Sequence, residues 1–126
     1  LAKQGKYGDA ISKLQSIVVD GKATVLDYNA LGYAYIITKQ YGKAIKFLKQ
    51  GEMLDNSELL LQLNLAHAYL LNKDFKSAKS IYKKYQSQNV TDGLGWTQKV
   101  KIDFETFEKA GLPYADFERV LRLFED

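Results

Sequence analysis

Side chains that could carry out chemistry are few in this chain of 126 residues. It contains a single histidine, His67, and no cysteine. A metal site built from several histidines or from thiolates is therefore excluded. No nucleophile motif such as Gly-x-Ser-x-Gly accompanies the histidine, so we do not expect it to take part in catalysis. Two interpretations of His67 stay open: contact with a partner, or partial burial with a hydrogen bond to a neighbouring side chain.

The acidic residues and glycines of the C-terminal part do not predict a reactive site either. Asp103 and Glu105 would point about 200° apart on a helix, and Glu105 and Glu108 would share a solvated face. Paired catalytic carboxylates need a pocket that shifts their pKa values. Gly93 and Gly95 lack the third glycine and the preceding strand of a phosphate-binding loop, and they predict a turn. We therefore predict that the chain is not an enzyme and needs no cofactor.

Lysines recur in two similar groups along the chain. Residues 1–90 hold 13 lysines, 7 acidic residues and no arginine, whereas residues 91–126 carry a net charge of −3. Lysines can follow a nucleic-acid backbone, but arginine is the more usual residue for phosphate recognition. We favour a solvated outer face, with nucleic-acid binding as the alternative. The two groups are Lys39, Lys43, Lys46 and Lys49, and then Lys73, Lys76, Lys79 and Lys83.

The elements that would position these side chains repeat at a constant interval. Ala10, Ala44 and Ala78 are evenly spaced, and the segment 31–35 recurs as 65–69 at the same interval. An interval of about 34 residues is typical of helical repeats, whose units stack to bury a continuous core. The chain contains only one proline, and the scarcity of this helix-breaking residue also favours helix.

This pattern resembles the tetratricopeptide-repeat (TPR) family, whose unit reads W-x2-L-G-x2-Y, then A-x3-F, then P. The usual proline is replaced by Lys22, Asn56 and Val90. The resemblance covers about residues 1–90 and implies an all-α fold, a right-handed α-solenoid of about two and a half helix hairpins. The second unit reads Tyr28-x2-Leu31-Gly32-x2-Tyr35 and Ala44-x3-Leu48, the third reads Gln62-x2-Leu65-Ala66-x2-Tyr69 and Ala78-x3-Tyr82, and the first keeps Ala10-x3-Leu14.

Local signals agree with paired helices. Gly32 and Ala66 are small enough to let two helices approach closely. Thr24 predicts a capping box at the start of one helix, Asn56 or Ser57 can cap the next, and Asp74 can cap the one after that.

Residues 91–126 leave the repeat and predict a helical cap, so that repeats and cap form one structural domain. A helix is expected over residues 96–110, ended by Gly111, and Pro113 is expected to start the next helix. This tail is similar to those of some bacterial TPR proteins, and the opening of the chain within a repeat predicts a fragment of a longer protein. The expected inner faces carry Trp96, Val100, Phe104 and Phe107, and then Phe117, Val120, Leu121 and Phe124.

The TPR resemblance implies that the first helix of each hairpin lines a concave groove that binds a peptide. Tyr33 is expected to be the anchor of a mainly apolar groove, unlike the charged groove that holds a C-terminal carboxylate. Some lining side chains, such as Ile37 and Leu71, are expected to pack between helices. The predicted partner-binding residues are Asn29, Tyr33, Ile36, Leu63, His67, Leu70 and Lys101.

We therefore predict a protein–protein interaction module that binds a peptide or a partner domain. The alternative is self-association through the apolar end at residues 1–14, and light scattering at several concentrations distinguishes the two. No run of about 18 apolar residues is present, so no membrane span is expected. The identity of the partner and the compartment are not predicted.

Overall fold

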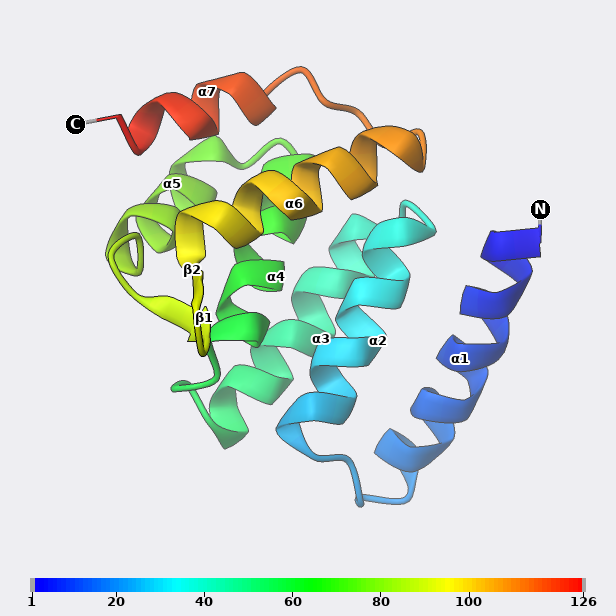
Figure 1. Ribbon diagram of the computed structural model, residues 1–126. Helices are drawn as coiled ribbons and strands as arrows, with labels where there is room; N and C mark the ends of the chain where they lie inside the picture. Colours follow the sequence, from blue (N-terminus) through cyan, green and yellow to red (C-terminus); the bar gives the residue numbers. More distant parts are fainter. Residues whose placement is uncertain (1, 126) are drawn as a thin grey trace.

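The computed structural model describes residues 2–125 of the chain, with side chains from residue 5 onward. It confirms the all-α repeat fold and adds a small β-ribbon. Helices α1 to α5 follow one another as an array, and α6 crosses in front of α4 towards α2, with α7 beyond it near α5 (Figure 1). The elements are α1 (Ala2–Val19), α2 (Val25–Ile37), α3 (Tyr41–Leu54), α4 (Leu59–Leu71), α5 (Phe75–Lys84), β1 (Asn89–Thr91), β2 (Leu94–Gly95), α6 (Trp96–Lys109) and α7 (Phe117–Leu123).

The turns inside the two hairpins repeat in backbone conformation as well as in sequence. Lys39 and Lys73 have left-handed φ angles of 64° and 68°. The N–H of Lys39 donates to the carbonyl of Ile36 at 3.0 Å, and that of Gln40 donates to the carbonyl of Tyr35 at 2.8 Å. Equivalent bonds occur at the same positions of the next repeat. This pair of bonds is the Schellman motif, which satisfies the last carbonyls of a helix.

Two of the three predicted helix caps are confirmed. The capping box at Thr24 is present, and the side chain of Asp74 caps α5. The prediction that Asn56 or Ser57 caps α4 is wrong, because the cap is Glu58. Both hydrogen bonds of Ser57 go instead to the carboxylate two residues before it, which holds it in the preceding turn.

Close helix packing depends on the small residues that the repeat predicts. A Cβ atom added to Gly32 would lie 2.3 Å from the side chain of Leu48, so α2 and α3 touch at this point. Ala44 and Ala78 are completely buried at the equivalent positions of α3 and α5. Leu1, which would belong to the first repeat, lies outside the described residues.

The tail differs from its prediction in two ways. Helix α6 matches the expected bounds to within one residue, and Gly111 follows its end with a φ of 81°. Pro113 does not start the next helix, which begins at Phe117. Residues 113–116 are non-helical and include a turn in which the N–H of Phe117 donates to the carbonyl of Tyr114, while Leu112 before them is buried in the core. The predicted turn at Gly93 is confirmed, but it joins the unpredicted strands β1 and β2.

Within residues 2–125, none of the helices combines the length and the apolar character that a membrane span requires.

Candidate functional site

Helix α6 lies against α4 and α2, and its aromatic residues occupy part of the face that these helices form. The ring centroid of Phe107 is 5.1 Å from that of His67 on α4 and 6.2 Å from that of Tyr33 on α2. The Phe104 ring lies 5.5 Å from His67, and it stacks on Phe117 of α7 at 4.1 Å. The expected groove is therefore partly filled by the chain itself.

A chain of four polar side chains joins the repeats to α6. His67 Nδ1 is 2.6 Å from the hydroxyl of Tyr82, and His67 Nε2 is 2.9 Å from Oδ2 of Asp103. Because a carboxylate can only accept, we assign the proton to Nε2, and Nδ1 then accepts from Tyr82. Nζ of Lys99 donates to the other oxygen of Asp103 at 2.7 Å. Helices α5, α4 and α6 are thus linked through one histidine.

The electrostatics of this network follow from burial and from close partners. Burial raises the pKa of the Asp103 carboxyl, but the hydrogen bonds from His67 and Lys99, together with the positive charge of Lys99, outweigh it, so that the pKa lies below its usual value. Burial, with the nearby Asp103, raises the pKa of Tyr82. The pKa of Tyr33 is raised to about 12, mainly by burial and further by the nearby Tyr7 and Asp103. Asp103 is therefore held as a carboxylate, and both tyrosines as phenols.

A tyrosine–histidine–aspartate series could in principle move a proton, but here it lies inside the fold. The rings of His67 and Tyr82 have no exposed surface. Within the described residues, no group of histidine and acidic side chains could hold a metal ion. Of the two interpretations of His67, the structure therefore supports burial with hydrogen bonds.

The structure buries three of the predicted groove residues. Ile36, His67 and Leu70 lie in the core or beneath α6, so their side chains are not part of the exposed face. Leu63 is also buried, although it forms part of the floor of a cleft. His67 is covered because the aromatic residues of α6 lie over the half of the face that contains it.

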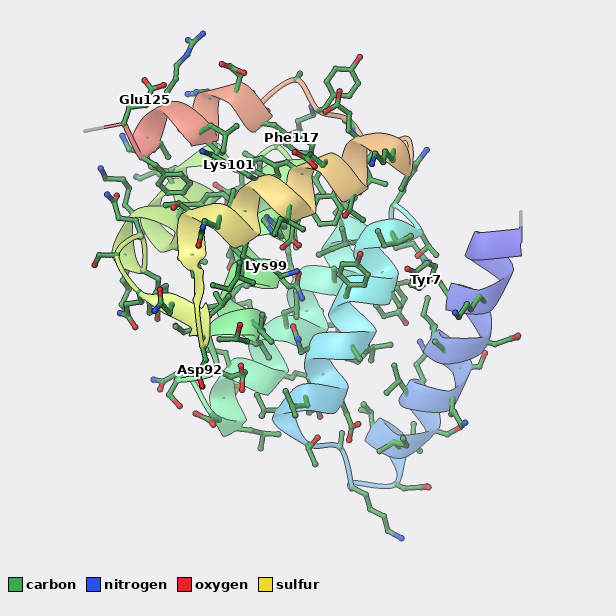
Figure 2. All side chains as sticks on the ribbon, in the orientation of Figure 1. Tyr7, Asp92, Lys99, Lys101, Phe117 and Glu125 are labelled. Atoms are coloured by element: carbon green, nitrogen blue, oxygen red, sulfur yellow. The ribbon has the colours of Figure 1, made fainter. Side chains whose placement is uncertain are left out.

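The predicted groove residue Lys101 lies on a different face of α6 from the groove. Lys101 is exposed and does not line the cleft, whereas Lys99 lies between α6 and the repeat helices (Figure 2). Positions two residues apart on a helix point about 200° away from one another. The sequence does contain a signal that could have placed Lys99 beside Asp103. The two residues have i,i+4 spacing, and such a pair often forms an ion pair on a helix.

The uncovered half of the face is a cleft of about 260 Å³ between α2, α4 and α6. The predicted residues Asn29 and Tyr33 lie on its wall, and both are half-buried. Nδ2 of Asn64 donates to Oδ1 of Asn29 at 2.8 Å. The sequence-based prediction missed Asn64, Lys99 and Asp103. The full lining is Asn29, Ala30, Tyr33, Leu60, Leu63, Asn64, Lys99 and Asp103.

Comparison with known families agrees with the observed hairpins. The sequence model described as tetratricopeptide repeat matches residues 28–58, which cover most of α2 and all of α3, and residues 61–89, which cover most of α4 and all of α5. The chain is a TPR protein. Neither the curated proteins nor the solved structures gave a significant match.

TPR repeats generally mediate protein–protein interaction, and the fold of this TPR protein fits that role. The family match begins after α1, so a first repeat over α1 stays a prediction that rests on the spacing of its alanine and leucine. Self-association through α1 stays a prediction. Its side chains Ile11, Leu14 and Val18 pack against the core, while Val19 is exposed.

Proposed function

We propose that this TPR protein binds a segment of a partner polypeptide in the cleft between α2, α4 and α6. The observation that carries the proposal is the cleft itself, which combines an apolar floor at Leu60 and Leu63 with polar groups on its walls. Within the described part of the chain, the bond from Asn64 to Asn29 leaves Nδ2 of Asn29 and Oδ1 of Asn64 for other partners. One donor and one acceptor side by side suit the N–H and C=O groups of a peptide backbone.

The size of the cleft favours a polypeptide over a metabolite. Its volume of about 260 Å³ lies just below the range of roughly 300–1,000 Å³ that is usual for small-molecule sites. One or two side chains of a bound peptide would fill it, while the rest of the peptide would lie over the edges of α2 and α6. Lys99 and Asp103 neutralise one another, so the cleft does not demand a charged ligand.

Filling the cleft is expected to abolish this binding without harming the fold. Ala30 is exposed on α2 and lines the cleft, so the indole of Ala30→Trp would occupy the site and displace no core side chain. Peptides selected from a random display library on the wild-type protein should bind the Ala30→Trp variant at least about tenfold more weakly. Fluorescence anisotropy measures the affinity, and circular dichroism confirms the helix content.

The matched control is Ala115→Trp, which adds the same ring to an exposed position of the loop before α7. This variant should bind the selected peptides as the wild type does. Equal binding by Ala30→Trp and the wild type would refute the proposed site.

A further inference from the structure

The outer side of α5 carries a cluster of lysines. The helix has four lysines and no acidic residue, and a shallow depression of about 520 Å³ is formed around them. Lysines three or four residues apart on a helix repel one another and mildly destabilise it. The depression is lined by Lys76, Lys79, Ser80, Lys83 and Lys84.

These lysines do not find carboxylate partners within the described residues, where the ion pairs involve His67, Lys99 and Arg119. Nζ of Lys83 donates to the carbonyl of Leu123 at 3.2 Å, and that of Lys84 lies 5.3 Å from the centre of the Tyr85 ring. Lys83 and Lys84 therefore each make one such contact, whereas neither kind of contact is found for Lys76 or Lys79 within the part of the chain that the structure describes.

A second cleft, of about 410 Å³, adjoins this charged surface between α3 and α5. It shares Ser80 and Lys84 with the depression, so the two form one continuous surface. Its apolar part includes Ile81 and the side chain of Met53, which is 87% exposed. An unbranched, flexible methionine in the open is suited to accommodating an apolar side chain of a partner.

The far wall of this second cleft is polar and held in place. Nε2 of Gln62 donates to Oε2 of Glu52 at 2.8 Å and to the carbonyl of Asn56 at 3.3 Å. The surface thus has an apolar part at Met53 and Ile81, a lysine side on α5, and a polar side formed by Glu52 of α3 and Gln62 of α4. No residue of this surface lines the cleft between α2, α4 and α6.

We propose that this surface is a second interaction site, which binds an acidic, amphipathic segment of a partner polypeptide. Apolar side chains of the segment would enter beside Met53 and Ile81, and its Asp or Glu residues would lie over Lys76 and Lys79. A nucleic acid fits less well, because its phosphate backbone would leave the apolar part of the cleft, beside Met53 and Ile81, unused.

A designed peptide tests the second site directly. The probe is a fluorescent helical peptide with leucines at i, i+3, i+4 and i+7 and glutamates at the other positions. The double variant Lys76→Glu/Lys79→Glu should bind it at least about tenfold more weakly than the wild type. Met53→Ser, at an exposed position, should weaken binding severalfold.

The matched control is Lys6→Glu/Lys13→Glu, which makes the same change of net charge at exposed positions of α1. This control should keep the wild-type affinity, and a peptide with lysine in place of every glutamate should not bind. The proposal is overturned if the control loses affinity equally, if Met53→Ser has no effect, or if a single-stranded oligonucleotide binds more tightly than the acidic peptide.

Discussion

Replacing His67 with alanine is expected to lower the free energy of unfolding by about 3–5 kcal/mol. The ring is completely buried, and its two nitrogens hold the hydroxyl of Tyr82 and the carboxylate of Asp103. The substitution would create a cavity, leave that hydroxyl without its partner and remove one of the two groups that compensate the buried charge of Asp103. Domains of this size are stable by about 5–15 kcal/mol, so the loss is a large share of the total.

Urea denaturation followed by circular dichroism measures this loss. Tyr82→Phe is the graded control, because it keeps the ring but removes one hydrogen bond and should cost about 1 kcal/mol. A cost below about 1 kcal/mol for His67→Ala would contradict the packing of α6 on α4.

Adding a single methyl group to Gly32 is expected to destabilise the protein by about 1–3 kcal/mol, although alanine is the better helix former. The new Cβ would lie 2.3 Å from both Cγ and Cδ2 of Leu48, whose side chain is fully buried and cannot move into solvent. Helices α2 and α3 would have to separate, and this packing is the basis of the hairpin.

The same substitution at Gly8 should have the opposite effect. Gly8 lies within α1, and nothing is found within 4 Å of the position that its Cβ would take. Gly8→Ala should therefore stabilise the protein by about 0.5–1 kcal/mol through helix propensity alone. Thermal unfolding of the two variants and the wild type measures both effects. An unchanged or raised melting temperature for Gly32→Ala would contradict the close approach of α2 and α3.

Much of the repeat array could be predicted from the sequence, because its determinants are local and periodic. The alanine spacing predicted the hairpins, and Thr24 and Asp74 predicted the starts of α2 and α5 correctly. Gly32 predicted close helix packing, which depends on the absence of a side chain at one position. In each case a residue acts on neighbours in its own or the next helix.

The candidate site could be predicted only in part, because its geometry depends on where the tail packs. The apolar spacing of Phe104 and Phe107 predicted an inner face of α6, but it could not indicate that this face would lie on His67. Asn29 and Tyr33 were found because they belong to the repeat. Lys99 was missed because the rotation of α6 about its axis is fixed by contacts with distant residues.

The cap of α4 and the start of α7 show a similar limit. Ser57 is the better capping residue by type, but its hydroxyl donates to Asp55 and Glu58 caps α4 instead. Pro113 fits the first turn of a helix, but a turn closed by the bond from Phe117 to the carbonyl of Tyr114 comes first, and the helix begins at Phe117. In both cases a neighbouring interaction overrode the local preference.

The central claim is that α6 closes half of the concave face of this TPR protein and leaves the other half as a binding cleft. Nuclear magnetic resonance tests it most directly, because the chain has one histidine and its ring protons give isolated signals. The ring centroid of His67 lies 5.1 Å from that of Phe107 and 5.7 Å from that of Tyr82. Nuclear Overhauser effects from the His67 ring protons to both rings are therefore predicted. An effect to Tyr82 without any to Phe107 or Phe104 would place α6 away from the groove and contradict the account.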